Sequence, residues 1–260
     1  MSQFLLDLII TPGHGGADPG AVAGGAKEKD FTLQKSLYQF GRAKELGLTV
    51  GITRSTDITM SLEEHALRVT ASKARVCLCN HINAGGGYGA EVYHSLKHKA
   101  KLAQLIMAEL KAAGAGVHGG DGVHTKASAK YRNDDGSPKD FYRMHFTDQT
   151  ETVIIEYGYI DNPKNLKQLQ AHWKAYAEAS LKAVCFYLGK PYMAPGVKPV
   201  APTAVKVTVN GKAIQATARL ANGVTDILVK GQWVPVRALA EAVGGTVAWD
   251  QATLTAKLNI

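Results

Sequence analysis

The chain is poor in cysteine and contains no long apolar run. Its 260 residues include three cysteines, Cys77, Cys79 and Cys185. An odd count at no recognisable framework spacing argues against a disulfide scaffold, and we expect three buried free thiols. No apolar run reaches the roughly 18 residues that a membrane span requires, so we predict no membrane-spanning segment.

The N-terminal segment also lacks the features of a secretion signal. No positively charged region precedes its apolar residues 4–10, Asp7 interrupts them, and no small-residue cleavage site follows. We therefore expect a buried strand here, and a protein made in the cytoplasm without a signal peptide.

Positive charge is in excess. The formal net charge is +8, from 30 basic and 22 acidic residues, which indicates polyanionic surroundings. Because the basic residues are scattered singly and no nucleic-acid motif appears, we predict no nucleic-acid partner. A bacterial wall carrying anionic polymers is the stronger candidate.

Short apolar segments alternate with segments of helical periodicity. Strands are predicted at 4–10, 48–53, 76–81, 90–95 and 152–156, and helices at 30–46, from 62 after a capping box, at 102–110 and at 163–188. This alternation predicts an α/β fold of three layers, with a mixed, mostly parallel sheet flanked by helices. Residues 114–140 fit neither pattern and are expected to form a long functional loop.

The composition changes after residue 189. Four of the nine prolines fall within 190–204, which predicts a semi-rigid linker between a domain at 1–189 and one at 205–260. In the second domain, alternating valines lead to Asn210-Gly211, a strong hairpin signal. A strand at 233–236, a helix at 237–243 and two closing strands complete a small α+β domain.

Three residues have the chemistry of a metal site. His14 lies in the glycine-rich loop 12–16, Glu28 lies just ahead of the first predicted helix, and His81 ends a predicted strand. Two histidines and one carboxylate are the protein ligands of many catalytic zinc sites. The spacing alone leaves open that Glu28 is an ordinary surface acid among lysines. Residues 11–14, 81–83 and 156 all fall where predicted strands end, the edge at which α/β sheets bind ligands.

Three stretches carry a family resemblance: TPGHGGADPGAVAGGAKEKDFTL, CNHINAGGGYGAEVYHS and VIIEYGYIDNPKN. In this order, and over residues 4–188, they resemble the zinc-dependent N-acetylmuramoyl-L-alanine amidases called amidase 3, which include bacterial autolysins and phage endolysins. The resemblance implies one catalytic zinc ion held by His14, Glu28 and His81, Glu156 as the catalytic acid and base, and supporting roles for Arg68 and Asn83. Thr11 and Cys79 depart from the family, which usually has Asp and Ser there, and are interpreted as variation in packing or in residues that contact the metal ligands.

The second domain resembles the small module at the N-terminus of copper amine oxidases, which recurs on bacterial wall proteins. Residues 205–260 contain no His or Cys, so no copper site is expected. The resemblance implies that this domain binds the cell wall.

Together these features predict a peptidoglycan hydrolase that cuts the amide between N-acetylmuramic acid and L-alanine. We expect a phage endolysin that reaches the wall through a holin, with residues 114–140 (Lys126, Lys130 and Arg132 among them) lining the substrate. A mother-cell autolysin would have the same features. Two other classes stay open: a zinc peptidase acting within the stem or cross-bridge peptide, and a non-catalytic wall-binding protein. Host, wall chemotype and oligomeric state are left undetermined.

Overall fold

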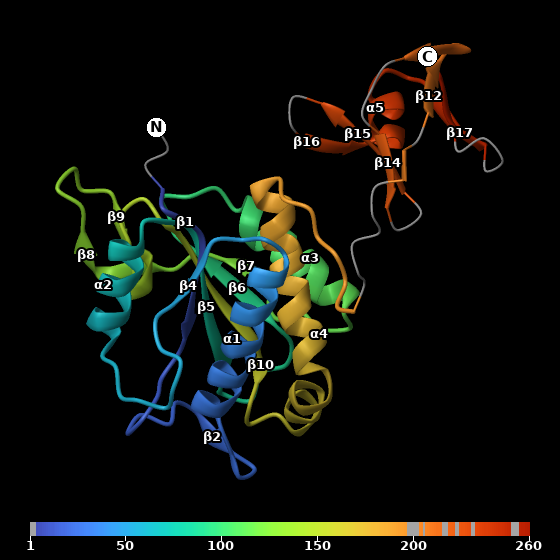
Figure 1. The fold of residues 1–260 in the computed structure, drawn as a ribbon. Coiled ribbons are helices and arrows are strands. Elements are labelled where there is room, and N and C mark those ends of the chain that lie inside the picture. The colour runs from blue at the N-terminus through green and yellow to red at the C-terminus, as the bar shows by residue number, and fades with distance from the viewer. Residues whose placement is uncertain are drawn as a thin grey trace. The chain divides into compact units, whose positions relative to one another are not determined.

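The computed structural model describes residues 4–196, 203–204, 206–214, 218–221, 224–229, 232–250 and 255–260. The chain divides into two compact units, Met1–Tyr192 and Met193–Ile260 (Figure 1). The division falls within the proline-rich segment 190–204. Each unit is described by itself.

A six-stranded sheet forms the centre of the first unit, in the order β4-β1-β5-β10-β6-β7. Strands β4, β1, β5 and β10 run parallel, and β6 is antiparallel to β10. The mixed, mostly parallel sheet confirms the predicted architecture. The strands are β1 (Leu6–Pro12), β4 (Val50–Ile52), β5 (Ala74–Asn83), β6 (Glu91–His94), β7 (Val123–His124) and β10 (Glu151–Tyr159).

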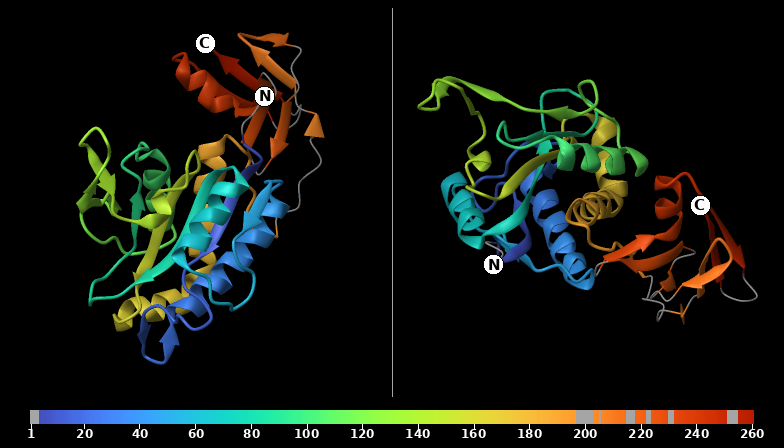
Figure 2. Two further views of the ribbon diagram at one scale, coloured as in Figure 1. Left: turned by 90° about the vertical axis from the view of Figure 1, so that its left-hand side faces the viewer. Right: turned by 90° about the horizontal axis from the view of Figure 1, so that it is seen from above.

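Helices cover both faces of this sheet, as Figure 2 shows from above. One face carries α1 (Glu28–Glu45), α3 (Lys101–Ala112) and α4 (Pro163–Leu188), and the other carries α2 (Leu62–Ser72) and the short 3-10 helix η1 (Arg143–His145). The predicted start signals are confirmed: Ser61 and Glu64 form a capping box for α2, and Asn162 caps α4 ahead of Pro163.

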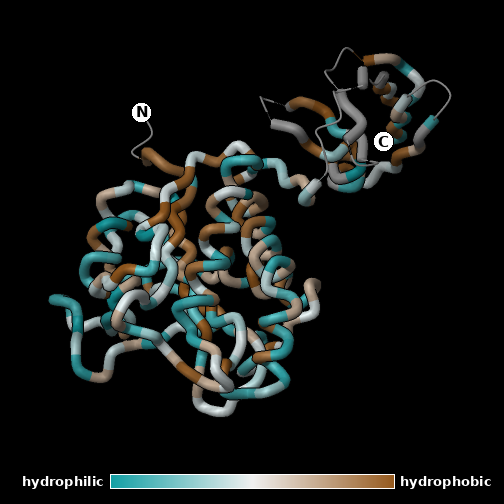
Figure 3. Tube along the Cα trace, turned by 60° about the horizontal axis from the view of Figure 1, so that its bottom comes forward, coloured by the Kyte–Doolittle hydropathy of each residue, from teal (hydrophilic) through white to brown (hydrophobic). Residues whose placement is uncertain are grey.

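Alternation along the strands divides the core between the two faces. Ile9, Cys77, Cys79 and Ile154 pack toward α2, where they join one buried cluster. The alternate positions, Leu8, Ile10, Leu78, Val153 and Ile155, are buried too. The hydrophobic colour in Figure 3 follows these central strands. All three cysteines are free and buried, as predicted.

Helix α1 turns an unexpected side to the sheet. Leu33, Leu37 and Phe40 give residues 30–46 their helical periodicity, but Leu37 is 40% exposed. The buried residues of α1 are largely polar: Glu28, Thr32, Lys35, Ser36, Gln39, Arg42 and Ala43. The reason lies in the sheet, whose Asn80 and Tyr157 are buried polar residues that need partners.

Those partners form a closed network. The Asn80 amide donates to Ser36 Oγ and to Gln39 Oε1, each at 2.7 Å, and Asn80 Oδ1 accepts from the Tyr157 hydroxyl at 2.9 Å. The Tyr157 hydroxyl also lies 2.8 Å from Ser180 Oγ on α4. Helices α1 and α4 are therefore held to β5 and β10 by hydrogen bonds as well as by packing.

The prediction of a loop over residues 114–140 was wrong in part. Besides β7, this segment forms the hairpin β8 (Ala127–Arg132) and β9 (Pro138–Asp140). Five of the six β8 residues are exposed, so no apolar alternation marked the strand. At the base of the hairpin, Asp140 accepts hydrogen bonds from Ser95 Oγ and from the Leu96 amide.

The described residues of the second unit form two four-stranded sheets, β11-β14-β15-β16 and β13-β12-β18-β17, and one helix, α5 (Val236–Ala242). The predicted hairpin at Asn210-Gly211 is confirmed, since both residues have positive φ and join β12 (Lys206–Val209) to β13 (Lys212–Ile214). Also present are β11 (Thr203–Ala204), β14 (Ala218–Ala221), β15 (Val224–Val229), β16 (Gln232–Pro235), β17 (Thr246–Asp250) and β18 (Thr255–Asn259). Strands β14 and β15 were not predicted. Among the described residues of both units, no helix is both long and apolar enough to cross a membrane.

The polar network predicts a large stability loss for Asn80→Ala. This substitution leaves buried hydrogen-bonding groups on Ser36, Gln39 and Tyr157 without their partner, which costs about 3 kcal/mol. Calorimetric unfolding of the full chain measures the effect. The control is Gln104→Ala at an exposed position of α3, which we expect to change stability by under about 0.5 kcal/mol. Equal melting of the two variants would contradict the network's importance.

Candidate metal centre

His14, Glu28 and His81 lie together at the carboxyl edge of the sheet. One ligand atom of each lies within 4.8 Å of the others. His14 follows β1, Glu28 opens α1, and His81 lies near the end of β5. His14 Nε2 is 3.1 Å from Glu28 Oε2, and His81 Nδ1 is 2.9 Å from Glu28 Oε1.

Glu28 is the hub of this cluster and is 3% exposed, so it is not a surface acid. Its Oε1 accepts from the Ile82 amide at 2.9 Å, and its Oε2 accepts from the Ala21 amide at 3.0 Å. Burial opposes its charge, but hydrogen bonds and charge from the two histidines hold the Glu28 pKa well below its usual range. The carboxylate is therefore ionised and oriented by both the backbone and the imidazoles.

The loop carrying His14 is held from outside the cluster. His14 has a φ of 59°, a strained value for a residue other than glycine, and its Nδ1 is 2.8 Å from Asp18 Oδ2. A carboxylate on the second ring nitrogen fixes the orientation of a metal-binding imidazole. Sequence reasoning missed Asp18, although its place four residues after His14 was the available signal.

Arg54 is a second residue that the sequence reasoning missed. It is buried and donates to the carbonyls of Pro12 at 3.3 Å and Gly13 at 2.9 Å, fixing the backbone just before His14. Arg68, the residue expected to support the site, is exposed and donates to the Thr53 carbonyl. Arg68 thus contacts the chain at Thr53, directly before Arg54.

Glycine permits the close approach of the loop to the histidines. A Cβ at Gly13 would lie 2.3 Å from His81 Cε1, and one at Gly20 would lie 2.6 Å from Glu28 Oε2. Gly20 also has a φ of 65°. Both positions therefore exclude any larger side chain while the ligands keep their places.

Glu156 on β10 is paired in register with His81 on β5 and with Glu91 on β6. Its Oε2 is buried without a hydrogen-bond partner among the described residues. Burial above all raises the Glu156 pKa to about 7. A largely buried carboxyl with a raised pKa, in register with the candidate ligand His81, has the chemistry of a general acid and base.

Asn83 contacts Glu91 rather than a metal ligand. Its amide donates to Glu91 Oε1 at 2.6 Å, and the Tyr159 and Tyr93 hydroxyls also donate to this buried carboxylate. His124 Nε2 lies 3.5 Å from Glu91 Oε2, which brings the segment after α3 back beside the site. Glu91 was missed because its strand gave only a short apolar signal.

The two departures from the family pattern lie in the buried core. Thr11 Oγ1 is 3.6 Å from Cys77 Sγ, and Cys79 belongs to the cluster packed against α2. Thr11 thus packs in the core, whereas the Cys79 thiol also interacts with the His81 imidazole, and the His14–Glu28–His81 cluster forms with both in place.

This donor set fits a zinc ion. Two imidazoles and a carboxylate are matched to Zn²⁺; Asp18 orients His14, and the Ala21 and Ile82 amides orient Glu28. The two histidine side chains are 25% and 22% exposed, so a ligand can approach the cluster from solvent. Among the described residues, this is the one group of His, Cys, Asp and Glu side chains with such geometry.

The fold and the site are those expected of a metal-dependent hydrolase, and the comparisons identify the family. The model of the N-acetylmuramoyl-L-alanine amidase family, amidase 3, matches residues 8–185. The chain belongs to this family. The resemblance of the N-terminal unit is thereby confirmed.

Individual relatives show the extent of the similarity. YqiI of Bacillus subtilis is 27% identical over 164 residues, covering 62% of this chain and 74% of YqiI. The endolysin of Bacillus phage SPP1 is 38% identical over 97 residues, which cover 35% of this chain and 34% of that protein. The catalytic domain of the amidase CwlV from Bacillus (Paenibacillus) polymyxa has the same fold, with a TM-score of 0.60 and 23% identity over 71% of this chain and 98% of that domain.

The close approach of Gly13 to His81 gives a test of the cluster. In Gly13→Ala the new methyl group must displace the His81 ring, so we expect zinc affinity to fall at least about tenfold, in the range typical of disturbed metal sites. The control is Gly41→Ala, within α1, where a Cβ meets nothing within 4 Å and helix propensity improves. Competition with a fluorescent zinc chelator measures both. Equal affinity in the two variants would show that His81 is not a ligand.

Proposed function

We propose that this protein is a zinc-dependent N-acetylmuramoyl-L-alanine amidase, which hydrolyses the amide between N-acetylmuramic acid and the L-alanine of the stem peptide. The observation that carries the proposal is the pairing of Glu156 with His81 across β10 and β5, beside the His14–Glu28–His81 cluster. Family membership supplies the substrate bond.

His14, Glu28 and His81 would hold the metal. Bound there, zinc supplies Lewis-acid chemistry, polarising a carbonyl and lowering the pKa of water. The Glu156 carboxylate would take a proton from the attacking water and deliver it to the departing L-alanine nitrogen. Its burial and its raised pKa suit both steps near neutral pH. Asp18 and Arg54 would act as positioning residues for His14.

Glu156→Gln tests this assignment. It keeps the size of the side chain but cannot carry the proton, so we expect activity to fall about 10²- to 10⁴-fold while zinc affinity is retained. The control is Glu63→Gln, an exposed acid of α2 paired with Arg143, which should leave the rate unchanged. Release of N-terminal L-alanine from purified peptidoglycan measures the rate. A Glu156→Gln protein with full activity would refute the role of Glu156.

A peptidase acting within the stem or cross-bridge would use the same ligands and the same acid and base. The metal cluster therefore does not distinguish the two reactions, and the amidase is favoured by the family match over residues 8–185. The identity of the newly exposed amino terminus separates them.

We further propose that the protein acts as an endolysin, made in the cytoplasm and released through a holin. The similarity to the SPP1 endolysin supports this role. The copper-amine-oxidase-like second unit would attach the enzyme to the wall, a role that suits the net charge of +8.

Expression inside Bacillus subtilis tests the endolysin role. We expect cells to stay intact until a pore-forming agent opens the membrane, after which turbidity should fall within minutes. Cells making Glu156→Gln, treated alike, should not lyse. Lysis of intact cells without the agent would contradict the proposed route.

A further inference from the structure

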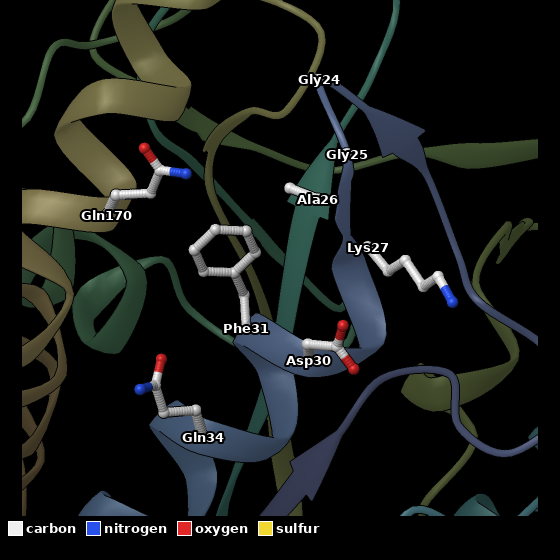
Figure 4. Close-up of a pocket in the computed structure, with 8 residues that line it drawn as sticks. All are labelled: Gly24, Gly25, Ala26, Lys27, Asp30, Phe31, Gln34 and Gln170. Atoms are coloured by element: carbon white, nitrogen blue, oxygen red, sulfur yellow. The ribbon is translucent and has the colours of Figure 1, made fainter.

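A second site lies next to the metal cluster. A hollow of about 480 Å³ opens between the first turns of α1, the helix α4 and the hairpin of β2 (Val22–Ala23) and β3 (Ala26–Lys27) (Figure 4). None of the residues that line it belongs to the proposed catalytic machinery.

The β2–β3 hairpin, which forms one wall of the hollow, is hydrogen-bonded to Glu28, a proposed metal ligand. The Ala21 amide donates to Glu28 Oε2 at 3.0 Å, and the Glu28 amide donates to the Ala21 carbonyl at 2.9 Å. The hairpin runs from Ala21 back to Glu28, so the hollow begins within a few residues of the cluster. A substrate long enough to extend past the cleaved bond can reach it.

The hollow combines an aromatic ring with two free amides. Phe31 is half-buried, and the amide groups of Gln34 and Gln170 are exposed and have no hydrogen-bond partner among the described residues. In Figure 4 the Gln170 amide is directed toward the Phe31 ring, whereas the charged ends of Lys27 and Asp30 extend away from that ring. The polar group directed toward the ring is therefore neutral, and Lys27 and Asp30 line the hollow with their charged ends turned away from the ring.

The tip of the hairpin leaves the hollow open. Gly24 and Gly25 both have positive φ, 55° and 77°, as a tight two-residue turn requires. A Cβ at Gly25 would meet nothing within 4 Å. The tip thus offers backbone rather than side chains to a ligand.

We propose that this hollow binds a neutral sugar ring of the glycan strand, adjoining the muramoyl residue whose amide is cut; the inference rests on the proposed amidase function. Side-chain amides both donate and accept, which suits sugar hydroxyl and acetamido groups, and the ring of Phe31 offers an apolar surface to one face of a pyranose. A volume of about 480 Å³ is within the range of small-ligand sites. The stem peptide carries charged groups, and a subsite for it would be expected to turn charges inward.

The first test is direct binding of peptide-free glycan chains to the full-length protein. We expect the side-chain amide NMR signals of Gln34 and Gln170 to shift on addition of these chains and not on addition of the free stem peptide. Absence of shifts with glycan, or shifts with the stem peptide instead, would overturn the proposal.

The second test compares substrates in the double variant Gln34→Ala/Gln170→Ala. We expect kcat/KM to fall about five- to tenfold, as for the loss of one or two hydrogen bonds, on substrates of four or more sugars. On a single muramoyl peptide it should change less than about twofold. The control Gln104→Ala should match the wild type on both. An equal loss on both substrates, or no loss, would overturn the sugar subsite.

The two proposals fail separately. A protein that binds glycan at Gln34 and Gln170 but releases no L-alanine terminus refutes the amidase function alone. A protein that cuts the amide with no glycan-dependent shift refutes the sugar subsite alone.

Discussion

The site depends on one carboxylate. Glu28 joins the two histidines, each of which contacts a different one of its oxygens, and the same oxygens accept the Ala21 and Ile82 amides. Four partners from three segments of the chain thus converge on a group that is nearly buried. A buried carboxylate without these partners would be costly, so the cluster and the local fold support each other.

The buried polar residues of α1 connect the Glu28 cluster to the core of the sheet. Glu28 is at the start of α1 and His81 is on β5, and the hydrogen bonds from Asn80 to Ser36 and Gln39 tie that helix to that strand. Asn80 precedes His81 directly, so the network fixes the strand position that carries the ligand. This explains why a helix packed on an α/β core buries polar rather than apolar residues.

The sequence predicted the order of strands and helices and the capped helix starts, because apolar runs and a capping box are local signals. The set of His14, Glu28 and His81 was implied by the family resemblance, since the spacing alone left Glu28 open as a surface acid. Arg54 was beyond reach because its role depends on the carbonyls of Pro12 and Gly13, which are distant in the chain. Asp18 had a local signal, its place four residues after His14, and was missed all the same. Glu91 was missed because its strand gave only a short apolar signal. The hairpin of β8 and β9 was not predicted for another reason: strands that are mostly exposed carry no apolar alternation.

Product chemistry on purified peptidoglycan tests the central claim most directly. After the metal is stripped with a chelator and zinc is restored, the account predicts new N-terminal L-alanine in amounts that follow the zinc added, with no new reducing sugar ends. New amino termini from any other residue, new reducing ends, or full activity in the stripped protein would contradict it.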